Sequence, residues 1–550
     1  MNHRIAFTWY EIGAWCFGLA LYLGLTCYQI ELPGLHYDEA IEVLPAMQML
    51  LGQPVQAYRD AGLPIGRFFF PLMTMDYIGA MNTYLSLPFL ALFGVRVSAI
   101  RIMPILFSAL TLLLTGLAAR RLYGRAAGII TLLTMAASIS FVFWSRQGIF
   151  VTNLTATIMM GMGLCGLTWW RGVGSRYLYG AGFLAGLGLY TKLIFVWAIV
   201  AFGGAFILLQ LDRIIAWVRR RGPAPWPKTT SREWLTALGA TIIPLIPFAI
   251  FNLQTGGTIA TFSKNLISSY YGVNNLAFFN NLLTRLDQFA VVLRGSHFWY
   301  LGESFENRLW VPALIAVLLL VVAVAVTRRR VTTFEHGWRL ALFPFVVMAL
   351  VLVQSCFTIS SLWFTHFAIA TPLPPLALAG GLNYVAQRAG RGRLLWPAAL
   401  TLVAGIVFYD VLADVRYHRV LAASGGYAAH SDAIYRLTDA LVDSADGPVV
   451  ALDWGIQAPV QFLSQGRVAP RELFGYDRLE EPDAGFASRL TPYLADRRTM
   501  YVMHPNEQEV YRGRRFAFTQ AVQAAGRQER LAGIIYERSG RPAAILVMVD

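Results

Sequence analysis

Two adjacent carboxylates, Asp38 and Glu39, follow directly after the first long apolar stretch of the chain. An ionised carboxylate close to hydrocarbon is costly, and proteins keep such groups mostly for function. A carboxylate in that position can accept a proton as a general base. Asp and Glu also suit the first turn of an ordinary helix. The rest of the sequence has to decide between these two interpretations.

The composition is that of a membrane protein. Of the 550 residues, 56% are hydrophobic and only 14% are charged, whereas soluble domains carry about 25% charged residues. Windows of about 20 apolar residues recur, and each is long enough to span the hydrocarbon of a bilayer. We therefore predict an all-α polytopic membrane protein with about eleven transmembrane helices.

The predicted spans alternate with short basic loops, among them Arg120-Arg121 and the run 328–330. Such loops mark the cytoplasmic side of a plasma (bacterial inner) membrane. The N-terminus is then inside, and two long loops, at about 31–96 and 254–309, are outside. The net charge of +14 arises from these basic loops, so it does not indicate a nucleic-acid partner. The expected spans are 9–30, 97–119, 127–144, 150–170, two within 177–211, 234–253, 310–326, 340–357, 362–385 and 394–412.

We expect the chain to divide after these spans, into residues 1–412 and residues 413–550. The second part has the charged content of soluble proteins, which predicts a small extracytoplasmic α/β domain. Its strands are expected at 449–452, 499–502, 533–537 and 543–549, and its helices at 457–463 and 516–525. A further apolar segment, 77–93, begins and ends outside and is expected to lie along the interface.

Cations fall on the same side as the acidic pair. Arg146, Lys192 and His366 lie at predicted outer turns, and His297 lies in the second long loop. Arg and Lys can hold a leaving phosphate and neutralise its growing charge, while a carboxylate takes a proton from the acceptor. The pattern therefore predicts a reaction between a hydroxyl and a phosphorylated lipid.

An ordered set of short motifs runs through the first 410 residues. In chain order the motifs are Asp38-Glu39, the run 76–88 followed by Phe93-Gly94, Arg101, Arg120-Arg121, Trp144-Ser145-Arg146, Thr191-Lys192, and His366 ahead of Pro372, Pro374 and Pro375. This set resembles the C-type (GT-C) membrane glycosyltransferases. It is most similar to the branch with the dolichyl-phosphate-mannose–protein mannosyltransferases and the bacterial aminoarabinose transferases that modify lipid A.

The resemblance implies a hexosyl- or pentosyltransferase that works on the outer face of the membrane. Such an enzyme moves one sugar from a polyprenyl-monophosphate donor to a hydroxyl of a lipid, glycan or protein, with inversion by a general base. Asp38 matches the base and Glu39 a supporting or second catalytic carboxylate. The donor phosphate would be bound by Arg146, Lys192 and His366, with possible support from Tyr84 and His297.

One departure from the family pattern concerns the residues after Arg146. Many members carry an acid there, whereas this chain has Asn153, which would act as a neutral hydrogen-bonding group. No cofactor is predicted with certainty. Adjacent carboxylates could hold a divalent cation through oxygen ligands, but we predict no metal site from ligand spacing.

Simpler interpretations remain for several residues. Lys192 could extend to the interface from an apolar helix, Arg146 could form a structural ion pair with the acidic loop, and His366 could be a packing residue. Alternative functions are a lipid-linked glycan ligase, a lipid-linked glycan transporter or flippase, and an inactive scaffold. A transporter predicts inverted repeats and ionisable residues at mid-membrane, and the sequence contains no evident repeat of this kind.

Overall fold

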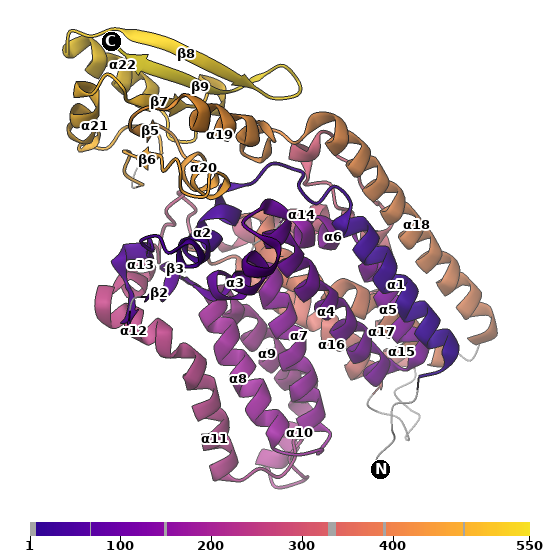
Figure 1. Cartoon of the computed structure of the whole chain (residues 1–550). Helices are drawn as coiled ribbons and strands as arrows, with labels where there is room; N and C mark the ends of the chain where they lie inside the picture. The colour runs from indigo at the N-terminus through magenta and orange to yellow at the C-terminus, as the bar shows by residue number, and fades with distance from the viewer. Residues whose placement is uncertain (1–6, 67, 148–150, 328–336, 389–391, 477–478) are drawn as a thin grey trace.

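The computed structural model describes residues 7–66, 68–147, 151–327, 337–388, 392–476 and 479–550, with the side chains of 151–153 and 392–394 outside this description. A bundle of apolar helices forms most of the molecule, and a small sheet with its own helices lies at one end, here called the sheet end (Figure 1). The bundle and its flanking helices are α1 (Trp9–Cys27), α4 (Val97–Tyr123), α5 (Arg125–Ala136), α6 (Ile139–Arg146), α7 (Val151–Trp170), α8 (Arg176–Thr191), α9 (Val196–Leu209), α10 (Leu211–Val218), α11 (Ser231–Ile242), α12 (Ile246–Thr255), α15 (Trp310–Thr327), α16 (Gly337–Ser355), α17 (Leu373–Arg388) and α18 (Gly392–Ser424).

The chain is a multi-pass membrane protein, but its spans are less uniform than the sequence predicts. Within the described ranges, 6 helices are long and apolar enough to cross a membrane, or up to 8 if α5 with α6 and α9 with α10 each count as one bent span. The helices α8 and α17 have only 16 residues each, or about 24 Å at 1.5 Å per residue. They fall short of the roughly 30 Å hydrocarbon core, so the predicted number of about eleven is not reached by length alone.

The first long loop is folded rather than extended. It contains α2 (Tyr37–Leu51), two short hairpins of strands β1 to β4, and α3 (Met81–Phe93). The strands are β1 (Gly62–Ile65), β2 (Phe68–Pro71), β3 (Met73–Met75) and β4 (Ile78–Gly79). The helices α2 and α3 are joined where Thr83 Oγ1 donates to the backbone oxygen of Glu42 at 2.7 Å. The apolar segment expected along the interface is therefore α3, held against the acidic helix.

The second long loop carries α13 (Gly257–Lys264) and α14 (Phe278–Arg294). It is tied to the first loop through Asp76. The side chain of Arg59 donates to both oxygens of Asp76, at 2.7 and 2.8 Å, and Thr261 Oγ1 donates to the same carboxylate at 2.6 Å. The two long loops therefore form one layer over the sheet end of the bundle.

The helix α18 is longer than the span predicted at 394–412. It continues to Ser424 because buried apolar residues, Tyr417 and Leu421, prolong its packed face beyond the predicted end. The expected division of the chain at 412/413 therefore lies inside a continuous helix. In Figure 1 this helix runs along the side of the bundle and leads to the C-terminal sheet.

The C-terminal sheet has five strands in the order β6-β5-β7-β9-β8. The strand β5 is parallel to β6 and β7, whereas β9 is antiparallel to β7 and β8. Four strands and two helices form close to their predicted positions. The elements are α19 (Ala433–Ser444), β5 (Val449–Ala451), α20 (Gln457–Leu463), β6 (Arg471–Glu472), α21 (Phe486–Ala495), β7 (Met500–Met503), α22 (Arg514–Ala524), β8 (Glu529–Tyr536) and β9 (Pro542–Val549).

A close backbone contact joins the first long loop to the end of α8. Ile78 forms an antiparallel β-bridge with Lys192, and the backbone N–H of Leu193 donates to the Tyr77 oxygen at 3.1 Å. A Cβ atom at Gly79 would lie 2.3 Å from the backbone oxygen of Tyr190. Only glycine allows this approach, which sets where Lys192 leaves its helix.

We predict that Gly79→Ala lowers the free energy of unfolding by about 1–3 kcal/mol, because the added methyl group cannot fit without a backbone shift. The measurement is the thermal unfolding midpoint of the purified protein in detergent. Gly239→Ala in α11 is the matched control, since a Cβ there meets nothing within 4 Å. Equal midpoints for the two variants would contradict the close contact.

Candidate functional site

The carboxylate of Asp38 stands at the first turn of α2. His36 is the N-cap of this helix, and its Nδ1 accepts a hydrogen bond from the Asp38 backbone N–H at 3.2 Å. The Asp38 side chain is 39% exposed and lies 3.8 Å from the His36 ring nitrogen. No donor among the described residues makes a hydrogen bond to its oxygens. The Asp38 carboxylate is therefore fixed by its helix but open to a ligand.

Glu39, the neighbouring carboxylate, is in the opposite situation. It is 1% exposed, and Arg101 donates to both of its oxygens, Nε at 2.9 Å and Nη2 at 3.1 Å. Burial raises the pKa of Glu39 to about 7, and the Arg101 guanidinium opposes this shift. Because both Glu39 oxygens are occupied, the Asp38-Glu39 pair does not present two open carboxylates to one cation.

Arg101 also donates hydrogen bonds to backbone oxygens, in addition to those it donates to the Glu39 carboxylate. Its Nη1 donates to the backbone oxygens of Ile30 and Pro33 at 2.9 Å, and its Nη2 donates to that of Gly34 at 3.2 Å. One fully buried guanidinium thus binds the chain before α2 and the first turn of α2 itself. The position of Asp38 depends on this set of contacts.

Lys192 is a cation close enough to Asp38 and Glu42 to interact with them electrostatically. It follows the last residue of α8, is half-buried, and makes no side-chain hydrogen bond to any described residue. Burial lowers the pKa of Lys192, and the carboxylates of Glu42 and Asp38 oppose this shift. An ammonium with open donors beside an open carboxylate is suited to hold an anion next to a proton acceptor.

Glu42 is a site residue that the predicted set does not contain. It lies one turn after Asp38 on α2, and Asn82 Nδ2 on α3 donates to its Oε2 at 2.7 Å. Burial raises the pKa of Glu42, while Asn82 and Lys192 act in the opposite direction. The i, i+4 spacing of Asp38 and Glu42 was the sequence signal that would have found it, since such residues share a helix face.

Arg285 on α14, the second residue outside the predicted set, lies against His366. Arg285 Nη2 donates to His366 Nδ1 at 3.3 Å, and His366 Nε2 lies 3.4 Å from Ser360 Oγ. Burial, with help from the charges of Lys192 and Arg285, holds the pKa of His366 well below its usual range. His366 is therefore a neutral hydrogen-bonding group beside Lys192, and Arg285 is the charged residue of this group.

The remaining predicted residues lie in other contacts. Arg146 is fully buried and donates to backbone oxygens at the end of α1, those of Thr26, Tyr28 and Gln29. Tyr84 donates its hydroxyl to the backbone oxygen of Pro71. Within the described residues, no printed contact joins either side chain to Asp38.

His297 and Asn153 complete the predicted set. His297 is buried among aromatic rings, with its ring centroid 4.8 Å from that of Trp144 and 5.5 Å from that of Phe364. Its ring nitrogens have no hydrogen-bond partner among the described residues. Asn153 falls in the first turn of α7, where the side chains lie outside the described part of the structure.

The C-terminal sheet covers the start of α2. The Tyr37 ring lies 4.7 Å from that of Trp454, and the Tyr37 and Tyr476 hydroxyl groups are 3.2 Å apart. Tyr271, from the second long loop, also interacts electrostatically with Asp38. Aromatic side chains from three segments therefore surround the approach to the open carboxylate.

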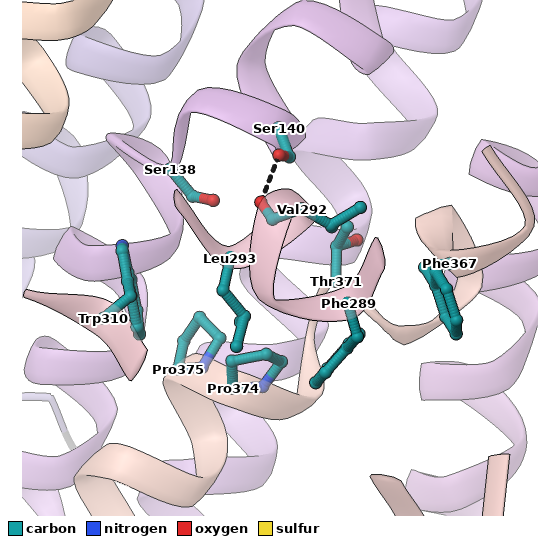
Figure 2. Close-up of a pocket in the computed structure, with 10 residues that line it drawn as sticks. All are labelled: Ser138, Ser140, Phe289, Val292, Leu293, Trp310, Phe367, Thr371, Pro374 and Pro375. Atoms are coloured by element: carbon teal, nitrogen blue, oxygen red, sulfur yellow. Dashed lines mark hydrogen bonds between the residues drawn. The ribbon is translucent and has the colours of Figure 1, made fainter. Parts of the chain in front are cut away.

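A small cavity elsewhere in the bundle is not part of this site. It is lined by Ser138, Phe289, Trp310 and Pro375 among others (Figure 2), and its volume of about 20 Å³ is on the scale of a single water molecule. Ser140 Oγ, at its edge, donates to the Val292 oxygen at 2.6 Å. Such a cavity is too small for a sugar.

Among the described residues no group of three or more His, Cys, Asp or Glu side chains lies close enough to hold a metal ion.

Comparisons with known proteins agree with this architecture. Residues 80–224 match the family of dolichyl-phosphate-mannose-protein mannosyltransferases, while no curated protein matches the chain. The structure is similar to that of ArnT from Cupriavidus metallidurans bound to undecaprenyl phosphate, with 12% identity, a TM-score of 0.57 and 98% of each chain covered. It is also similar to the Archaeoglobus fulgidus oligosaccharyltransferase, with 11% identity, a TM-score of 0.51, and 89% of this chain and 68% of that chain covered. The chain has the GT-C fold, which confirms the resemblance found in its sequence.

We predict that Arg101→Met lowers the free energy of unfolding by about 3–5 kcal/mol, because it leaves the buried Glu39 carboxylate without its partner. Adding Glu39→Gln to this variant should recover part of the loss. The thermal unfolding midpoint in detergent is the measurement. Arg308→Met is the matched control, since the Arg308 side chain is 84% exposed and pairs with Glu306 at the surface; it should cost at most about 1 kcal/mol. Equal losses for Arg101→Met and Arg308→Met would contradict the role of Arg101.

Proposed function

We propose that this chain is a membrane glycosyltransferase that moves one sugar from a polyprenyl-monophosphate donor to a hydroxyl acceptor. The observation that carries the proposal is the pairing of an open carboxylate, Asp38, with an open ammonium, Lys192, on a GT-C fold. The reaction needs one group to accept a proton and another to hold a leaving phosphate. Asp38 and Lys192 supply these two functions from opposite walls of one site.

In the proposed step, the acceptor oxygen forms a bond to the anomeric carbon while the bond from that carbon to the phosphate oxygen breaks. The hydroxyl proton passes to the Asp38 carboxylate. The polyprenyl phosphate leaves with the bonding electron pair, and its negative charge is balanced by Lys192 and by Arg285 behind it. Attack opposite the leaving group inverts the anomeric centre.

The other residues of the site position these groups. Glu39, held by Arg101, fixes the turn that carries Asp38. Glu42, held by Asn82, favours the charged form of Lys192 through its own negative charge. His366, in its neutral form, is a hydrogen-bond partner for a phosphate or sugar oxygen. Arg146 supports the site at a distance, through the end of α1.

The proposed orientation places the sheet end outside the plasma membrane and the N-terminus inside. The basic loops support this orientation, because such loops stay on the cytoplasmic side. The acceptor is then a lipid, glycan or protein of the outer face. Mass spectrometry of the envelope from cells with and without this chain would identify the sugar that is missing and the molecule that carries it.

We predict that Asp38→Asn slows transfer at least about 100-fold, because a positioned general base contributes about 100- to 10,000-fold. The amide keeps the size of the side chain, so the variant should fold and still bind undecaprenyl phosphate. The product identified in the envelope is the quantity to measure. Asp60→Asn is the matched control, since Asp60 is an exposed carboxylate in the same loop, and its transfer should be unchanged. Near-normal transfer by Asp38→Asn would place the base elsewhere.

For Lys192→Gln we expect the affinity for undecaprenyl phosphate to fall about 10- to 150-fold, which corresponds to the loss of about 1.5–3 kcal/mol for a charge-assisted hydrogen bond. Binding can be followed by native mass spectrometry or by the thermal shift that the lipid produces. Lys264→Gln, at an exposed position of α13, is the control and should bind as the unmodified chain does. An unchanged affinity in Lys192→Gln would remove Lys192 from the donor site.

A further inference from the structure

A second, much larger cavity lies inside the helical bundle. It has a volume of about 600 Å³, which is within the range of ligand pockets. Its walls come from α4, α7, α8, α9, α11, α16 and α17 and are almost entirely apolar, with Met160, Leu167, Phe202 and Phe343 among the lining residues. Neither Asp38 nor Lys192 lines it.

The polar groups of this cavity gather at one end. Arg339 Nη1 donates to Gln210 Oε1 at 2.9 Å, and both residues line the cavity. Arg339 Nη2 donates to Asp212 at 2.6 Å. Arg339 is only 8% exposed, and its Nε has no hydrogen-bond partner among the described residues. A buried guanidinium with an unused donor points to an anionic ligand, because unpaired buried donors are destabilising.

This polar end lies far from the site of sugar transfer. Gln210 directly precedes α10, which lies at the end of the bundle away from the sheet (Figure 1). Between Lys192 and Gln210 runs α9, with 14 residues, or about 21 Å at 1.5 Å per residue. A phosphate bound at Lys192 therefore cannot also contact Arg339.

Tryptophan side chains mark the same end as a membrane interface. Trp169 packs against Trp234, with ring centroids 5.6 Å apart, and Trp170 Nε1 donates to the Pro225 oxygen at 2.9 Å. Trp169, Trp170, Trp226 and Trp234 all line the cavity. Tryptophan is enriched where hydrocarbon meets the head groups of lipids. The cavity thus runs from this interface into the hydrocarbon region.

The surrounding charge favours an anion. The stretch 210–221 contains Arg213 and the exposed run Arg219 to Arg221, with Asp212 as its single acid. Basic pockets between transmembrane helices bind the head groups of anionic lipids. A zwitterionic lipid such as phosphatidylcholine has the same phosphate but adds an ammonium group, which this basic stretch disfavours.

We propose that this cavity binds an anionic phospholipid of the leaflet opposite the transfer site, with an acyl chain inside the bundle and the phosphate at Arg339. The room for the chain comes from glycines. A Cβ atom at Gly166 or Gly203, both lining residues, would meet nothing within 4 Å. The bound lipid fills the space between α7, α9 and α16 and stabilises their packing, as a ligand of the folded state does.

The test compares dioleoyl phosphatidylglycerol with dioleoyl phosphatidylcholine, added in mixed micelles to the purified full-length chain. Bound lipid is measured by native mass spectrometry, and stabilisation by the thermal unfolding midpoint. We expect phosphatidylglycerol to stay bound and to raise the midpoint, and phosphatidylcholine to do neither. Equal effects of the two lipids would overturn the proposal.

Two kinds of variant probe the two parts of the site. Gly166→Leu and Gly203→Leu fill the cavity and should remove at least about nine-tenths of the bound phosphatidylglycerol, a tenfold loss that equals about 1.4 kcal/mol. Gly239→Leu is the control, since Gly239 is an equally open helical glycine that does not line the cavity. Arg339→Gln should lose the preference for phosphatidylglycerol, whereas Arg308→Gln, at an exposed position outside the basic stretch, should keep it. If Arg339→Gln does not fold, the glycine variants decide alone.

Two outcomes would overturn the proposal outright. The first is unchanged phosphatidylglycerol binding in both cavity-filling variants. The second is displacement of phosphatidylglycerol by undecaprenyl phosphate, which would assign the cavity to the donor lipid. Asp38→Asn should retain the full response to phosphatidylglycerol, so that failure of this proposal and failure of the proposed function give different results.

Discussion

The buried ion pair of Arg101 and Glu39 is the interaction on which the rest of the site depends. The guanidinium spans α4, the chain leaving α1, and the first turn of α2, and it uses charge-assisted hydrogen bonds in each direction. Removing two charges from water is unfavourable in itself. The pair is therefore better understood as a means of fixing geometry than as a source of stability. It determines where α2 begins, and thereby where Asp38 stands.

The charged side chains around this ion pair fall into two groups: those that are hydrogen-bonded to the protein and those that are open to a ligand. Both oxygens of Glu39, one oxygen of Glu42 and the guanidinium of Arg285 are hydrogen-bonded to neighbouring residues. The side chains of Asp38 and Lys192 make no hydrogen bond to a described residue, although each lies next to residues that do. The residues next to Asp38 and Lys192 already make their hydrogen bonds to other parts of the protein. Asp38 and Lys192 therefore do not turn toward these neighbours, and both remain oriented for a ligand. The proposed transfer reaction would require preorganisation of this kind.

Much of the fold followed from the sequence, whereas the roles assigned to the site residues stay predictions. Apolar windows and basic loops located nearly every bundle helix, and the turn that carries Asp38 was identified because it breaks the apolar pattern. The contacts of Arg146 were not foreseen, because its backbone acceptors at the end of α1 lie about 120 positions earlier in the chain. Arg285 was not selected for the same reason, since only folding brings α14 to His366. The end of α18 was misplaced because the prediction ended the helix where it had crossed the hydrocarbon core. The apolar, packed face of α18 continues beyond that length.

The contact between α2 and the C-terminal sheet has a consequence for biosynthesis. Ala458 and Phe462 of α20 belong to the same hydrophobic cluster as Val43 and Met47 of α2, and Gln53 Nε2 donates to the backbone oxygen of Gln465, 412 positions later in the chain. Translation therefore delivers the acidic helix early and its covering partner last. Before α20 is made, α3 and α4 already pack against α2, and only the part of its apolar face that contacts Ala458 and Phe462 stays uncovered. The start of the helix that carries Asp38 is therefore covered in two stages, first by helices of the bundle and much later by the C-terminal sheet.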